Sequence, residues 1–196
     1  MVKKITKVKI IAQYVSDYGR KYYLREIGSL LKKPHQTIKP YIEGLVKEGI
    51  LTKDKRKNIV EYCLNFKHKG VYDYLVIAEK EKLIERIEEE TLLKVIYEKL
   101  SLYFVNNTFI IFGSSVNKIE KGSDIDLLIA GRANINKVIH EFQEIYNKNI
   151  HRVQISNFNK LTHTLIKEIY KKHLILNNTE QIVRFFGEQH EQNKLV

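Results

Sequence analysis

The chain has 196 residues, enough for one large domain or two small ones, each with a working core. The formal net charge is +11, and residues 1–66 hold 15 Lys/Arg against 6 Asp/Glu, so nearly all of the excess lies in the first third. This local excess favours two domains and indicates a polyanion partner, although basic solvated surfaces are also common. The single cysteine, Cys63, excludes a disulfide framework and a cysteine-based zinc site.

The composition predicts a cytoplasmic protein. A lone cysteine agrees with a reducing interior. The start, Met1-Val2-Lys3-Lys4-Ile5, alternates charged and apolar residues and lacks the uninterrupted run of a signal peptide. No segment approaches the ~18 apolar residues of a membrane span.

Residues 1–66 carry three helical patterns followed by two strands. We expect helices over residues 3–16, 23–32 and 38–46, with a turn at 33–37 and strands over 50–53 and 59–64. Pro40 lies inside the third pattern, where it removes a backbone donor. We therefore expect that helix to start late or to kink.

Three helices and a basic-tipped hairpin make a winged helix, and the string from Thr37 to Leu51 resembles the recognition helix and first wing strand of prokaryotic winged helix-turn-helix regulators. The resemblance implies a DNA-binding domain over residues 1–66, with RNA as the alternative. It places the third helix in the major groove and the wing on the backbone or at the minor groove. The open alternative is a domain for packing or protein contacts, with a basic face kept for solubility. The candidate nucleic-acid-binding residues are Lys33, His35, Gln36, Thr37, Lys39, Lys55, Arg56 and Lys57.

Residues 67–104 read as a helical linker that Thr91 divides into two helices. Their apolar stripes fit packing within the same chain. The same stripes could instead pair two subunits as a homodimer.

Residues 105–196 alternate strand and helix patterns. We expect strands over 109–112, 124–129 and 151–156, and helices over 134–148, 159–172 and 179–186. The whole chain is then of the α+β class.

The candidate residues for binding a metal ion and phosphates lie where the first of these strands ends and the second begins. Asp124 and Asp126 stand two residues apart on a strand, so both side chains point to one face, about 7 Å apart. Such a pair suits Mg²⁺, with Mn²⁺ as the alternative, together with a nucleotide's phosphates. Gly113 and Ser114, at the end of the preceding strand, would offer backbone N–H groups and a hydroxyl to the same phosphates.

A Gly-Ser turn, nine residues and then Asp-x-Asp on an apolar strand resemble the signature of polymerase-β-like nucleotidyltransferases, particularly the minimal prokaryotic and archaeal ones. The resemblance covers roughly Leu100 to Phe158. It implies an α/β domain with a short mixed sheet, catalytic and metal-binding roles for Asp124 and Asp126, and nucleotide binding by Gly113 and Ser114. Ser123 and Lys118 are further nucleotide-binding candidates, and Lys121 could add charge.

The family's third metal-binding acid should fall near Gln154. An amide is a poorer cation ligand than a carboxylate, which weighs against a second metal and against turnover. Three functions therefore compete. The first is an enzyme that transfers a nucleoside monophosphate from a nucleoside triphosphate to a nucleic-acid or protein hydroxyl. The second is a DNA-binding regulator that senses a nucleotide, and the third is an antitoxin paired with a small toxin protein.

Overall fold

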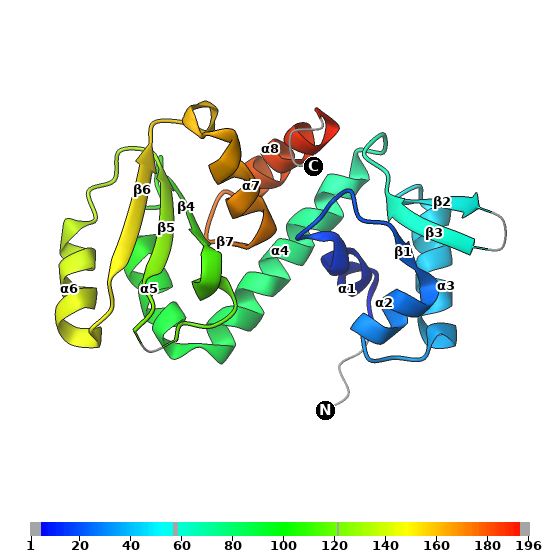
Figure 1. Ribbon diagram of the computed structural model, residues 1–196, viewed down its shortest axis with the longest axis horizontal. Coiled ribbons are helices and arrows are strands. Elements are labelled where there is room, and N and C mark those ends of the chain that lie inside the picture. Colours follow the sequence, from blue (N-terminus) through cyan, green and yellow to red (C-terminus); the bar gives the residue numbers. More distant parts are fainter. Residues whose placement is uncertain (1–4, 57–58, 121, 193–196) are drawn as a thin grey trace. The chain divides into compact units, whose positions relative to one another are not determined.

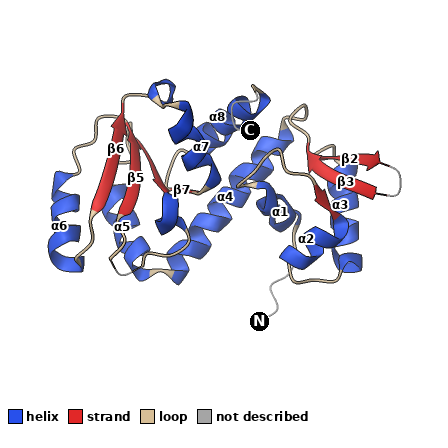
Figure 2. Ribbon diagram, in the orientation of Figure 1, coloured by secondary structure: helices blue, strands red, loops and turns tan. Residues whose placement is uncertain are grey.

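The computed structural model describes residues 5–56, 59–120 and 122–192. The chain divides into two compact units, one formed by residues 1–79 and 180–196 and the other by residues 80–179. Figure 1 follows the elements along the chain, and Figure 2 shows that each unit combines helices with a sheet. Among the described residues, no helix has both the length and the apolar character needed to cross a bilayer.

The first unit contains a three-stranded antiparallel sheet of order β1-β3-β2. Tyr14, Ile27, Ile38, Ile42 and Leu45 are fully buried in this unit. Each of the three expected helical patterns contains a helix, and both expected strands are present. The elements are α1 (Lys7–Ile11), the 3₁₀ helix η1 (Ala12–Tyr14), β1 (Tyr22–Tyr23), α2 (Leu24–Leu30), α3 (His35–Lys47), β2 (Leu51–Arg56), β3 (Ile59–Leu64), the first half of α4 (Gly70–Glu89), and α8 (Thr179–Glu191).

Helix α3 contradicts one of the two outcomes expected around Pro40, a late start. The helix begins at His35, so it neither starts late nor leaves residues 35–37 in a turn. Pro40 lacks the N–H that would bond to the carbonyl of Gln36. Both residues are exposed, so water can solvate that carbonyl and the helix tolerates the loss.

The second unit is built on a mixed four-stranded sheet of order β6-β5-β4-β7, as the α/β prediction for this part required. Strands β5 and β6 are parallel, while β4 is antiparallel to both β5 and β7. The three-residue strand β7 was not predicted, because an apolar run that short has no period to recognise. The elements are α5 (Thr91–Ser101), β4 (Thr108–Phe112), the 3₁₀ helix η2 (Gly113–Val116), β5 (Ile125–Ala130), α6 (Asn136–Tyr146), β6 (Ile150–Ile155), the 3₁₀ helix η3 (Phe158–Lys160), α7 (His163–Lys171) and β7 (His173–Ile175).

One face of this sheet carries the main core of the unit. Helices α5 and α6 supply Leu93, Ile96, Leu100, Val138 and Phe142 to a cluster with alternate strand residues Phe109, Ile111, Ile125, Leu127, Ile129 and Ile150. Asp126 alternates with Ile125 and Leu127, so its side chain points to the opposite face. The helix-packed core therefore fixes the face on which the candidate site lies.

Candidate functional site

The turn after β4 brings a glycine backbone against one of the two predicted acids. Gly113 has φ of +74°, a conformation that residues with a Cβ rarely adopt. A Cβ at position 113 would lie 2.8 Å from Oδ2 of Asp126, too close for a carbon–oxygen contact. The backbone angle favours glycine here, and any larger residue would also displace the carboxylate of Asp126.

Some of the hydrogen-bond donors in this turn already have partners within the protein. The N–H of Gly113 donates to the carbonyl of Lys172 (3.2 Å), so it stabilises the sheet. Ser114 is exposed, which leaves its hydroxyl accessible to a ligand. The buried hydroxyl of Ser115 donates to the carbonyl of Asp124 (2.7 Å) and ties the turn to the start of β5.

The two acids each contact a neighbour on the β6 side of the sheet. Asp124 precedes β5 and accepts a hydrogen bond from the side-chain amide of Asn149 (3.1 Å). Oδ1 of Asp126 lies 3.2 Å from Nδ1 of His151. Ile125, between the acids, is fully buried in the core. The acids thus lie on the sheet face away from Ile125, each with one polar partner.

The structure shows that the location predicted for the third acidic position is wrong. In the parallel register of β5 and β6, Gln154 pairs with Ile129, whereas His151 pairs with Asp126. Paired residues in a parallel ladder point to the same face, so Gln154 belongs to the face opposite Asp126. Its amide donates to the carbonyls of Gly131 and Ala133. The side chain that stands beside Asp126 on β6 is an imidazole.

The loop before Asp124 is shaped by hydrogen bonds to its own carbonyls. Ser123 donates its hydroxyl to the carbonyl of Glu120 (2.8 Å), and Lys118 is exposed to solvent. Nζ of Lys148, a residue only 7% exposed, donates to the carbonyls of Glu120 and Ser123. Lys121 lies outside the described residues. Ser123 and Lys148 therefore stabilise this loop by donating hydrogen bonds to its carbonyls.

The acidic pair has the chemistry to hold one divalent cation. Within residues 5–56, 59–120 and 122–192, no group of three or more His, Cys, Asp or Glu is arranged to hold a metal. Over the same residues, neither Asp124 nor Asp126 forms an ion pair with a lysine or arginine. Mg²⁺ commonly takes only one or two carboxylates and completes its shell with water and phosphate oxygens. The two residues fit that requirement.

Comparison with known families adds to this geometry. Residues 94–181 match the family model described as Polymerase beta, Nucleotidyltransferase. Residues 94–181 form a polymerase-β-like nucleotidyltransferase domain. This nucleotidyltransferase domain contains the whole four-stranded sheet, the η2 turn and both aspartates. Domains of this kind typically use divalent metals, which agrees with the cation chemistry of Asp124 and Asp126. Comparisons with curated proteins and with solved structures found no match.

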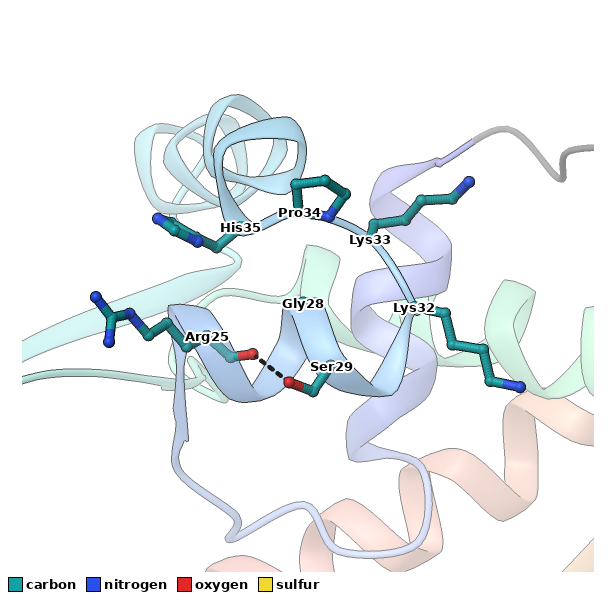
Figure 3. A pocket seen from close by; sticks show the side chains of 7 residues that line it. All are labelled: Arg25, Gly28, Ser29, Lys32, Lys33, Pro34 and His35. Atoms are coloured by element: carbon teal, nitrogen blue, oxygen red, sulfur yellow. Dashed lines mark hydrogen bonds between the residues drawn. The ribbon is translucent and has the colours of Figure 1, made fainter.

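Outside the nucleotidyltransferase domain, basic residues surround a hollow of about 420 Å³ between α2 and the start of α3. Figure 3 shows Arg25 and His35 extending to one side of it, with Lys32 and Lys33 on the other. Lys32 takes a left-handed conformation (φ 52°), which turns the chain sharply between the helices. The hollow is lined by Arg25, Gly28, Ser29, Lys32, Lys33, Pro34 and His35.

The remaining predicted nucleic-acid-binding residues are spread over α3 and the hairpin. Gln36, Thr37 and Lys39 are exposed on the first turns of α3. Nζ of Lys39 lies 3.8 Å from Oε1 of Glu43, one helical turn later. Lys55 is exposed on β2, and Arg56 ends that strand. Lys57 lies outside the described residues. Arg25 and Lys32, which line the hollow, were not among the predicted residues.

Several other side chains at the candidate active site were not predicted from the sequence. They are Arg86, Ser115, Lys148, Asn149 and His151, each of which contacts the turn, the loop or an acid. None belongs to a recognisable spacing with Asp124 and Asp126. Only His151 could have been found, from its place at the start of the strand that follows the acidic pair.

Proposed function

We propose that the protein transfers a nucleoside monophosphate from a nucleoside triphosphate to a hydroxyl group, with metal-dependent chemistry at Asp124 and Asp126. The observation that supports this most is the closeness of the Gly113 turn to the Asp126 carboxylate, since a Cβ at position 113 would stand 2.8 Å from Oδ2 of Asp126. The family match of residues 94–181 supports nucleotidyl transfer as the reaction class.

In this proposal the residues have separate roles. Asp124 and Asp126 would hold the cation, which supplies charge neutralisation for the phosphates and the leaving group. Ser114 would donate its exposed hydroxyl to a phosphate oxygen. The acceptor oxygen forms a bond to the α-phosphorus and loses its proton, while the bond from that phosphorus to pyrophosphate breaks. Asn149 and His151 orient the carboxylates through their hydrogen bonds.

The test is a transfer assay with each α-labelled nucleoside triphosphate, Mg²⁺ or Mn²⁺, and RNA, DNA and protein acceptors. We expect label in one acceptor class, and we expect Asp126→Asn to abolish it. Glu141→Gln, an acid on α6 that pairs with Lys99, is the matched control and should retain transfer. Transfer that survives in both Asp124→Asn and Asp126→Asn would remove these acids from the reaction.

A second function, nucleotide sensing without turnover, is favoured by one specific feature. The residue paired with Asp126 on β6 is His151, so no third carboxylate stands there. A site with two carboxylates can still bind one cation and a nucleotide. Calorimetric binding of Mg²⁺-nucleotide together with no label in any acceptor would select this function over transfer.

We further propose that residues 1–66 form a winged helix that binds DNA. The three helices, the three-stranded antiparallel sheet and the basic residues around the start of α3 support it. Binding should weaken steeply with salt, because phosphate contacts release counterions. The double variant Lys33→Gln, Lys39→Gln should lower the slope of log K against log salt by about 2, one unit for each phosphate contact. Lys94→Gln on α5 is the control, and a flat salt response would contradict the proposal.

A further inference from the structure

Two cationic side chains contact the loop between β4 and β5, the segment from Gly113 to Asp124. Nε of Arg86, on α4, donates to the carbonyl of Val116 (2.9 Å), the last residue of η2. Nζ of Lys148, between α6 and β6, donates to the carbonyls of Glu120 and Ser123 (3.3 Å to the latter). Each half of the loop is therefore held by a positive charge.

Both cations are poorly compensated by acids. Lys148 is 7% exposed and, over the described residues, forms no ion pair with a carboxylate. The Arg86 side chain is 15% exposed, and its ion-pair partner Glu89 (3.4 Å) is largely in solvent. Nη2 of Arg86 is buried and has no hydrogen-bond partner in the part of the chain that the structure describes. Over the described residues, Lys148 has no carboxylate partner, and Arg86 has only an exposed one.

A buried lysine such as Lys148, or a largely buried arginine such as Arg86, is an energetically costly hydrogen-bond donor for a carbonyl. Removing an ammonium or guanidinium group from water is unfavourable unless a counter-charge compensates it. A neutral donor such as glutamine would satisfy the same carbonyls at a lower cost. The choice of two cations is explained if an anion binds at this loop, because their charge then stabilises the complex.

We propose that Arg86 and Lys148 are positioning residues that hold the carbonyls of Val116, Glu120 and Ser123 in place beside a bound polyphosphate and supply the positive charge that favours it. They act through the carbonyls of the loop and do not have to touch the ligand. The inference rests on the proposed function, and it holds whether the bound nucleotide is turned over or only sensed. Its ligand class is the polyphosphate tail of a nucleotide.

The test measures, on the full-length protein, calorimetric affinities for tripolyphosphate, a nucleoside triphosphate and the corresponding monophosphate, each with Mg²⁺. Arg86→Gln and Lys148→Gln keep an N–H donor but remove the charge. Each should weaken the affinity for both triphosphate ligands about tenfold, because one positive charge near the polyphosphate is lost. The monophosphate should lose less because it carries fewer charges. Arg86→Lys and Lys148→Arg should recover most of the affinity, and exposed Lys94→Gln is the control.

The outcomes separate this inference from the proposed function. If the unmodified protein binds none of the three ligands, both are overturned. If it binds them and the glutamine variants bind equally well, or lose the same factor for mono- and triphosphate, only the positioning role is overturned. If Arg86→Gln or Lys148→Gln does not fold, Glu89→Gln provides the test. Glu89 is 62% exposed, so its substitution should leave the fold intact. It removes the acid beside Arg86 and should raise triphosphate affinity about twofold, as expected for one exposed pair. An unchanged affinity would count against the role of Arg86.

Discussion

Replacing Gly113 by alanine tests the contact that joins the turn to the acidic pair. The substitution introduces two costs. Alanine at φ of +74° is strained by about 1–2 kcal/mol. Its Cβ would also stand 2.8 Å from Oδ2 of Asp126, so the carboxylate must shift, which disturbs the position that it takes beside His151.

The two costs should appear in different assays. Urea unfolding should show a loss of about 1–2 kcal/mol from the backbone strain. Calorimetry with Mg²⁺-nucleotide should show affinity weakened at least about tenfold, because a displaced carboxylate gives up a charge-assisted contact.

Gly122→Ala is the matched control for Gly113→Ala. Gly122 has φ of +84°, but a Cβ there meets nothing within 4 Å. The Gly122→Ala variant should lose a similar free energy of unfolding but should retain its affinity for Mg²⁺-nucleotide. Equal nucleotide affinity in the two variants would refute the reasoning, because the Asp126 contact would then have no consequence for the site.

Three further predictions concern single side chains. Ser115→Ala should lower the free energy of unfolding by about 0.5–1.5 kcal/mol, because it removes the hydrogen bond to the carbonyl of Asp124; exposed Ser114→Ala should change it by less than about 0.5 kcal/mol. Burial lowers the pKa of His190, although the negative charges of Asp17 and Glu191 oppose this shift. The contribution of neutral His190 to the free energy of unfolding should therefore be fully present above about pH 6.5 and should decrease as the pH falls below it. His190→Phe, which keeps the ring packed on Phe66, should reduce that pH dependence in urea unfolding, and an unchanged profile would contradict the assignment. Leu100→Ala, in the core beneath the sheet, should cost about 2–5 kcal/mol, against less than about 0.5 kcal/mol for exposed Leu102→Ala.

Much of the fold could be predicted because its signals are local. The helical period predicted two helices over residues 67–104 divided at Thr91, and the structure has α4 and α5 with the division one residue earlier, at Glu90. The apolar runs predicted β4 and β5, since their core-facing residues are contiguous or alternate within five or six positions. The match of residues 94–181 confirms the nucleotidyltransferase domain inferred from the turn and the acidic pair.

The errors involve interactions that local patterns do not encode. Gln154 was placed beside the acids from its distance along the chain, but its neighbour depends on the register between β5 and β6. A shift of one residue in register moves a side chain to the other face. Pro40 was expected to delay or kink α3, yet the helix begins at His35, because the rest of the helix outweighs one lost hydrogen bond at an exposed carbonyl.

By itself, the sequence determined the acids of the candidate site and the turn that precedes them, because a strand's period of two and the backbone freedom of glycine are properties of the residues themselves. Only the tertiary structure decided which side chains surround them. Asn149 and His151 reach the acids through strand pairing, and Arg86 and Lys148 reach the loop through helix packing. Contacts between segments distant in the chain depend on register and on the shared core, and no short stretch of sequence specifies either.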